Sequence, residues 1–284
     1  MALVFVAFVW GATFVLVKEA LDDISTLLFL ALRFTLAGAV LAIGYRGLLA
    51  GILERRGASL RGGLAAGACL FGGYVFQTFG LRLTTPSKAA FLTGMFIVLV
   101  PALNALVWRR RPQIAEAAGI GAAAVGLGLL TLQPGDWNMA PGDLLVLGGA
   151  VFFALHVIVL SLFAPREGFE RLSVFQIATA ALLALGTFWW AEAPRVKWSL
   201  TVGVALAVTG LLATAAAFTI QAWAQQRTSA TRTALIFALE PVFAAATSFL
   251  ASGELLSGRQ ITGAALILAG ILLVELKPKL PARP

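Results

Sequence analysis

Ten apolar stretches divide this chain into two groups of five, and no other feature constrains its fold as strongly. Each stretch approaches the roughly 20 residues that an α-helix needs to cross the ~30 Å apolar core of a bilayer. Helices fit better than barrel strands, because the stretches are long and lack strict alternation of apolar and polar residues. The predicted spans cover residues 2–17, 26–43, 62–80, 89–108, 114–132, 144–163, 172–191, 200–223, 234–251 and 261–274.

The composition is that of an all-α integral membrane protein. Hydrophobic residues make up 60% of the chain and charged residues only 12%, against roughly 25% charged residues in a soluble domain. About two thirds of the 21 Lys and Arg residues fall in loops on one side of the predicted bundle, and the positive-inside rule makes that side cytoplasmic. We therefore expect both termini in the cytoplasm, with the first span retained rather than cleaved as a signal peptide.

Several kinds of partner are not expected. The net charge of +8 is spread over short loops, so it reads as a topology signal rather than a nucleic-acid-binding surface. The chain has one Cys and one His, which argues against a disulfide framework and against a metal site. The expected partners are a small-molecule substrate and membrane lipid, without a cofactor.

The two groups of five resemble each other when the sequence is shifted by about 143 positions. The shift pairs Thr13 with His156 and Arg33 with Gln176. Because five is odd, the second group must cross the membrane in the opposite direction to the first. Inverted repeats of this kind are typical of carriers that work by alternating access.

The repeat predicts one membrane domain made of two halves, residues 1–135 and 136–284. An inverted repeat within one chain supplies its own pseudo-two-fold axis, so a functional monomer is expected. A channel is less favoured, because channels usually place rings of polar groups around an oligomeric pore.

Four short motifs carry a family resemblance. They are Trp10-Gly11, Leu32-Arg33-Phe34, the run TTPSKAAFLTGMFIVLVP from Thr84 to Pro101, and Leu239-Glu240-Pro241-Val242. With them, the whole chain resembles the drug/metabolite transporter (DMT) superfamily. It is most similar to the EamA-type ten-helix transporters, in particular the bacterial amino-acid exporters of the YddG type.

The resemblance implies a transporter of the bacterial cytoplasmic (inner) membrane, with spans 1, 3, 4, 6, 8 and 9 around a central cavity. It also implies that spans 2 and 7 are more peripheral and that spans 5 and 10 form a scaffold. The family usually has a Glu after the fourth span and another after the ninth. Here Glu254 follows the ninth span, but the run Arg109-Arg110-Arg111-Pro112 replaces the first.

Three ionisable residues lie within predicted spans, where such groups are functional candidates by default. Arg33 could snorkel outward, hold a loop carbonyl or contact substrate. His156 is too deep to snorkel; it is either a satisfied interior residue or a neutral hydrogen-bonding group of the cavity. Glu240 has a coupling or a structural role, and Arg33 is one candidate partner for it.

Prolines in spans 4 and 9 are predicted hinges. Pro101 and Pro241 each lack a backbone donor and disrupt the helical ladder near the residue four positions earlier. The two prolines occupy similar places in the inverted halves, where a weakened helix could assist rocking.

The predicted substrate is a zwitterionic amino acid, exported with broad side-chain tolerance. The predicted substrate-binding residues combine neutral polar groups with apolar walls: Trp10, Thr13, Tyr74, Gln77, Phe91, Asn104, Phe153, His156, Gln221 and Phe237. An exporter of multiple drugs or organic cations, using Glu240, is the alternative. An intramembrane enzyme ranks lower, because there is no GxSG or HExxH motif and His156 has no facing nucleophile.

Overall fold

The computed structural model describes residues 1–47, 60–108, 113–132, 138–252 and 257–275. Every named element in this part of the chain is helical, and the only recorded strand-like pairing is an isolated bridge between Ile24 and Val196. The chain is thus an all-α membrane protein, as predicted. The predicted division between residues 135 and 136, the Arg109 to Pro112 run and Glu254 lie outside the described residues.

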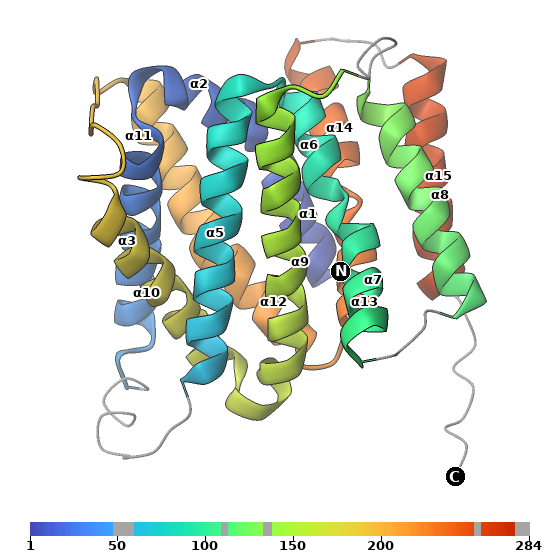
Figure 1. Ribbon diagram of the computed structural model, residues 1–284, viewed down its shortest axis with the longest axis horizontal. Coiled ribbons are helices and arrows are strands. Elements are labelled where there is room, and N and C mark those ends of the chain that lie inside the picture. The colour runs from blue at the N-terminus through green and yellow to red at the C-terminus, as the bar shows by residue number, and fades with distance from the viewer. Residues whose placement is uncertain (48–59, 109–112, 133–137, 253–256, 276–284) are drawn as a thin grey trace.

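The ten predicted spans correspond to ten helices, some of them interrupted (Figure 1). The first group is α1 (Ala2–Gly11) with α2 (Phe14–Asp23), α3 (Thr26–Gly44), α5 (Arg61–Leu83), α6 (Pro86–Gly94) with α7 (Phe96–Trp108), and α8 (Ile114–Thr131). The second group is α9 (Pro141–Glu167), α10 (Phe169–Thr187), α11 (Leu200–Ala207) with η1 (Val208–Ala216) and α12 (Ala217–Gln225), α13 (Ala230–Phe237) with α14 (Glu240–Ser252), and α15 (Gly258–Glu275). Among the described residues, eight spans are long and apolar enough to cross a membrane.

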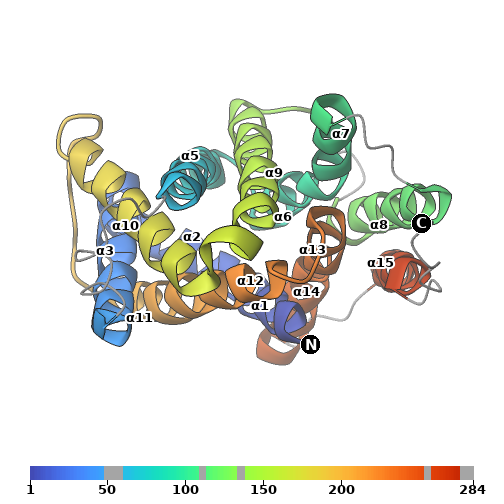
Figure 2. The ribbon, with the colours of Figure 1, turned by 90° about the horizontal axis from the view of Figure 1, so that it is seen from below.

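The helices form a bundle with a separate pair at one end. Seen from below, α8 and α15 stand together at one end and α3, α10 and α11 at the other, with α1, α5, α9 and α12 between them (Figure 2). The pair α8 and α15 is closely packed: a Cβ on Gly126 would lie 2.5 Å from the Gly263 carbonyl oxygen, and one on Gly119 would lie 2.7 Å from that of Gly270. Small residues allow this approach of two backbones.

A second glycine contact joins α5 to α9. A Cβ on Gly80 would lie 2.6 Å from the carbonyl oxygen of Gly142, and a Cβ on Gly149 would lie 3.0 Å from that of Gly73. We call these four residues the α5–α9 glycine contact. It brings two long, uninterrupted helices from different halves of the sequence into backbone contact.

Four spans are irregular. Span 1 is interrupted at Ala12 and Thr13, and span 4 at Met95. Span 8 contains the π-helical segment η1, and span 9 is interrupted between Phe237 and Glu240. The sequence predicted weak points only in spans 4 and 9, and those four spans are the ones that meet at the pocket described below.

The prolines relate differently to these interruptions. In span 9 the break directly precedes Pro241, whose ring crowds the carbonyl of residue 237, four positions earlier. In span 4 the break lies at Met95, so Pro101 sits inside α7 instead. The hinge role of both prolines remains a prediction.

Candidate functional site

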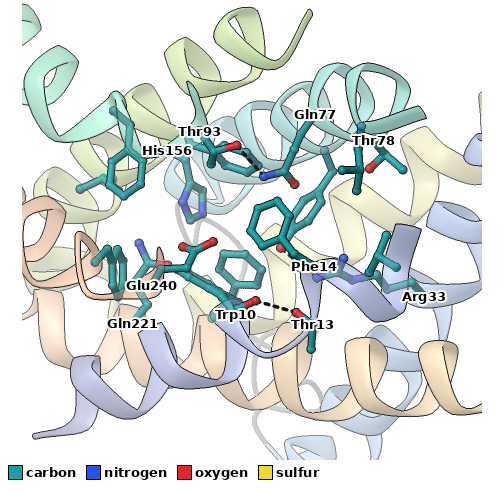
Figure 3. A pocket seen from close by; sticks show the side chains of 18 residues that line it. Trp10, Thr13, Phe14, Arg33, Gln77, Thr78, Thr93, His156, Gln221 and Glu240 are labelled. Atoms are coloured by element: carbon teal, nitrogen blue, oxygen red, sulfur yellow. Dashed lines mark hydrogen bonds between the residues drawn. The ribbon is translucent and has the colours of Figure 1, made fainter. Parts of the chain in front are cut away.

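A central pocket opens among seven of the ten spans. It comprises about 700 Å³ of empty space, including its open mouth. Eight of the ten predicted substrate-binding residues line it: Trp10, Thr13, Tyr74, Gln77, Phe153, His156, Gln221 and Phe237. Arg33 and Glu240 line the same pocket (Figure 3).

Two predicted residues do not line this pocket. Phe91 is half-buried and packs at the edge of the apolar core. Asn104 lies in α7, beyond Pro101 from the pocket-lining residues Thr93 and Phe96. The break at Met95 separates α6 from α7, so one continuous helical pattern does not describe which faces of span 4 point inward.

Aromatic rings form the wall of the pocket in two repeat-related pairs. The centroids of Tyr74 and Phe153 are 5.3 Å apart, and those of the equivalent residues Phe218 and Trp10 are 5.2 Å apart. Tyr74 and Phe218 approach each other at 6.2 Å and join the pairs. Phe218 was absent from the predicted set, although its alignment with Tyr74 in the repeat was a usable signal.

Arg33 is buried at one side of the pocket rather than snorkelling outward. Its Nε donates to Thr214 Oγ1 at 2.7 Å and its Nη2 to the Tyr74 hydroxyl at 2.8 Å. The guanidinium carbon lies 4.2 Å from the centroid of the Tyr74 ring. These bonds use Nε and Nη2, so they fix the side chain while leaving Nη1 for a ligand.

The π-helical segment η1 holds both Arg33 and Trp10. The backbone N–H of Ala217 donates to Leu212 O, five residues earlier, rather than to Ala213 O. The Ala213 carbonyl instead accepts from Trp10 Nε1 at 2.9 Å and from Arg33 Nη2 at 3.5 Å. Such π segments are frequent at functional sites, and this one orients two pocket residues from spans 1 and 2.

His156 faces the pocket from α9 and contacts α10 behind it. Its side chain is buried, with Nε2 2.8 Å from Gln176 Oε1. Its ring also packs edge-on against Phe218, with centroids 5.4 Å apart. The predicted depth of His156 is therefore correct, and its role in binding stays a prediction.

Glu240 lies at the N-terminal end of α14, where the helix dipole favours a carboxylate. Gly11 packs directly on this point: a Cβ on it would meet the Glu240 carbonyl oxygen and lie 2.9 Å from Ala244 N. Glu240 does not pair with Arg33, since the one ion pair recorded in the described part of the chain joins Lys88 to Asp143. Figure 3 shows the two side chains on opposite sides of the pocket.

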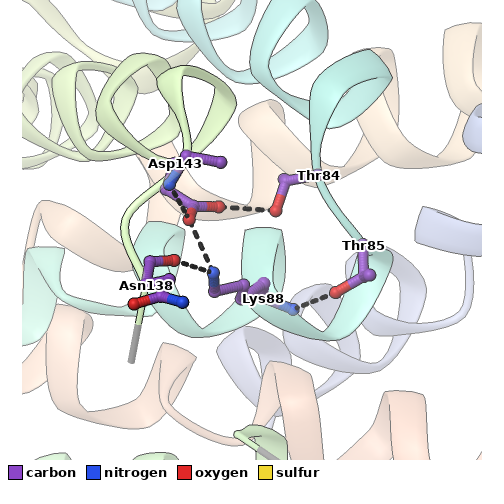
Figure 4. A network of polar contacts seen from close by, with 6 residues as sticks. Thr84, Thr85, Lys88, Asn138 and Asp143 are labelled. Carbon is purple, nitrogen blue, oxygen red and sulfur yellow. Dashed lines mark hydrogen bonds and ion pairs between the residues drawn. The ribbon is translucent and has the colours of Figure 1, made fainter. Parts of the chain in front are cut away.

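At the upper end of the bundle, a polar cluster ties the loop before α6 to the start of α9 (Figure 4). Asp143 accepts from Thr84 Oγ1 at 2.5 Å and from Lys88 Nζ at 2.7 Å. Lys88 Nζ also donates to Asn138 O at 2.7 Å, and the backbone N–H of Ala140 donates to Asp143 at 2.8 Å. Sequence reasoning missed this buried carboxylate, because Asp143 was read as a loop residue.

The described residues thus build a pocket suited to a small amphipathic molecule. One side offers a fixed guanidinium, the other a carboxyl group, and aromatic rings lie between them. Neutral groups such as Gln77, whose Nε2 donates to Thr93 Oγ1 at 3.0 Å, complete the lining.

Comparisons with known proteins agree with this architecture. The profile of the EamA-like transporter family matches residues 1–132 and again residues 140–276. An uncharacterized transporter of Archaeoglobus fulgidus is 31% identical over 98% of this chain and 85% of its own length. A probable amino-acid metabolite efflux pump of Salmonella typhimurium is 27% identical over 94% of this chain and 91% of its own length.

The resemblance to the YddG type is partial. The aromatic amino acid exporter YddG of Ancylobacter novellus is 29% identical over 64% of this chain and 64% of its own length. The family match, by contrast, spans nearly the whole sequence in two copies. The chain belongs to the EamA-like transporter family, and it is a multi-pass membrane transporter.

Proposed function

We propose that this transporter exports zwitterionic amino acids, with a preference for large apolar side chains, by alternating access. The observation that carries the proposal is that Arg33 and Glu240 line one pocket without pairing with each other. Two relatives, the efflux pump of S. typhimurium and the exporter of A. novellus, carry amino acids in their names and support the same substrate class.

The charges of the pocket match those of an amino acid. A carboxylate would take the free Nη1 of Arg33, because guanidinium binds carboxylates with strong, directional hydrogen bonds. The ammonium group would lie toward Glu240 on the opposite side. A ligand that carries both charges offsets the cost of burying each one.

The aromatic wall determines how side chains are accepted. Trp10 contacts both Phe218 and Phe237, with centroids 5.2 and 4.8 Å away. Such a surface favours large apolar groups but discriminates weakly among them, since one methylene changes binding by only about 1–3 kcal/mol. Broad tolerance among apolar amino acids follows.

An organic-cation exporter is the second candidate. Glu240 and the rings of Trp10 and Phe237 line the same pocket, and a carboxylate with aromatic rings is a typical cation site. Arg33 argues against it, because its fixed positive charge lines the pocket as well and would repel a ligand that carries only a cation.

Counterflow in proteoliposomes tests the proposal. Vesicles preloaded with unlabelled phenylalanine, leucine, a sugar or tetraphenylphosphonium would be diluted into labelled phenylalanine. We expect uptake only with the amino acids inside. Uptake driven by the organic cation alone, or equal uptake with every load, would contradict an amino-acid carrier.

The proposed orientation places both termini in the cytoplasm of a bacterial inner membrane, in line with the distribution of Lys and Arg. Arg166, at the lower end of α9, is then cytoplasmic, and Lys197, in the loop before α11, is external. Single cysteines at these positions in a Cys69→Ser background would be labelled in intact cells with an impermeant maleimide. Labelling at 197 but not 166 is expected; the reverse pattern would invert the topology.

A further inference from the structure

A chain of buried amides runs from the pocket toward the lower end of the bundle. Gln221 Nε2 donates to Gln225 Oε1 at 2.9 Å. Gln225 Nε2 in turn donates to Val157 O at 2.8 Å and to Ser161 Oγ at 2.7 Å. Both glutamine side chains are about 1% exposed, so water does not compete for these bonds.

The direction of this chain is fixed by its last member. A backbone carbonyl can only accept a hydrogen bond, so Val157 requires the NH₂ end of Gln225. The Gln225 oxygen then points at Gln221, and two amide oxygens cannot bond to each other. Gln221 must therefore present its NH₂ end to Gln225 and turn its oxygen elsewhere.

That oxygen has no partner. Gln221 Oε1 is buried and accepts no hydrogen bond within the described part of the chain, although Gln221 lines the pocket. A buried acceptor without a donor is costly, and a ligand that supplies a donor removes that cost. Gln176 Nε2 is also unsatisfied, but Gln176 does not line the pocket and no backbone carbonyl fixes its direction.

We propose that Gln221 Oε1 accepts a hydrogen bond from the amino group of the substrate, and that Gln225 is a positioning residue that keeps this oxygen facing the ligand. In Figure 3, Gln221 and Glu240 both lie across the pocket from Arg33. The amine is thus held on the side opposite the guanidinium. The inference rests on the proposed amino-acid substrate and names the residue that recognises its amine.

Three related ligands test this assignment on the purified full-length protein. Phenylalanine carries both charged groups, phenylethylamine carries only the amine, and 3-phenylpropionate carries only the acid. Dissociation constants would be measured by calorimetry for the unchanged protein and for Gln221→Met. A hydrogen bond to a charged group implies at least about tenfold weaker binding of both amine-bearing ligands, with 3-phenylpropionate unchanged within about twofold.

Gln225→Met separates positioning from packing. It leaves Gln221 in place but frees its amide to turn, so a smaller loss, about threefold, is expected for the same two ligands. Gln226→Met is the matched control, since Gln226 is a neighbouring half-buried amide outside the pocket, with Nε2 3.3 Å from Ala164 O. It should change none of the three constants, and thermal melting would show that each variant is folded.

The outcomes distinguish this inference from the proposed function. An equal loss for all three ligands, or a loss confined to the acid, would overturn the role of Gln221 while leaving amino-acid transport intact. If the unchanged protein binds only phenylethylamine, and Gln221→Met weakens it, the amine site stands and the amino-acid substrate fails. Binding of none of the three would overturn both.

Discussion

Two repeat-related helix contacts in this transporter are built differently. The contact of α5 with α9 joins uninterrupted helices through glycines. The equivalent contact of span 8 with span 1 involves a π-helical segment and a helix broken at Ala12 and Thr13. In the repeat, Ala217 and Val6 stand where Gly73 and Gly149 stand in the first contact.

The difference shows how an inverted repeat can divide its tasks. The centres of the two contacts are alike, since Tyr74 with Phe153 and Phe218 with Trp10 have nearly equal ring distances. Away from the centre, glycines hold one contact rigidly, whereas larger side chains and unpaired carbonyls leave the other irregular. We expect the contact between spans 1 and 8 to change when the pocket switches sides.

The largest effect is expected from filling the α5–α9 glycine contact. Gly80→Val would place side-chain atoms where the Gly142 carbonyl and Val146 already lie, at a cost of about 3 kcal/mol or more in the free energy of unfolding. Gly186→Val is the control, because no atom lies within 4 Å of a Cβ there. Melting in detergent would measure both; a stable Gly80 variant would show that this contact is not rigid.

Arg33→Gln should reduce the kcat/KM of amino-acid counterflow by roughly 30- to 100-fold, since hydrogen bonds to charged groups contribute about 1.5–3 kcal/mol each. It also removes the bond from Arg33 to Thr214 in η1, and so tests the irregular side of the comparison. Arg33→Lys keeps the charge but not the fork of donors, and should recover only part of the activity. A glutamine variant with full activity would remove Arg33 from the site.

Trp10→Phe should have a moderate effect, about fivefold on transport. It keeps an aromatic ring but removes the indole N–H that donates to Ala213 O, a bond with a net value of about 1 kcal/mol. The control is Trp223→Phe in α12, where the ring is largely exposed. Equal effects of both changes would mean that the bond to η1 does not matter.

The smallest effects are expected from the prolines. Pro241→Ala should slow flux about threefold with little change in substrate affinity, because Pro241 directly follows a helix break and Ala restores a backbone donor. Pro101→Ala should do less, since Pro101 lies within α7, away from the break at Met95. Comparing flux with equilibrium binding separates the two quantities. Unchanged flux in the double variant would reject the hinge role.

Hydrophobicity and the repeat predicted most of the fold. Span lengths gave the ten helices, and the repeat offset placed Thr13, His156, Gln77 and Gln221 at matching depths, all of which line the pocket. Polar side chains in lipid-embedded helices need a partner or a cavity, so their depth was informative without any structure.

The irregular backbone and its consequences could not be predicted in this way. Hydrophobic periodicity does not distinguish the five-residue turns of η1 from ordinary helix, so the contact of Arg33 with Thr214 and Ala213 was missed. The pocket excludes Phe91 and Asn104 because the break at Met95 interrupts span 4 between them. The direction of the Gln221 amide depends on a carbonyl in another helix, which only a folded structure reveals.

The central claim is that Arg33 and Glu240 receive the two ends of a zwitterion in one pocket. An experimental structure with bound phenylalanine tests it most directly. We predict that the substrate carboxylate lies within hydrogen-bond distance of Arg33 and that its ammonium group faces Glu240 and Gln221. An amino acid bound in the opposite sense, or bound outside this pocket, would contradict the account.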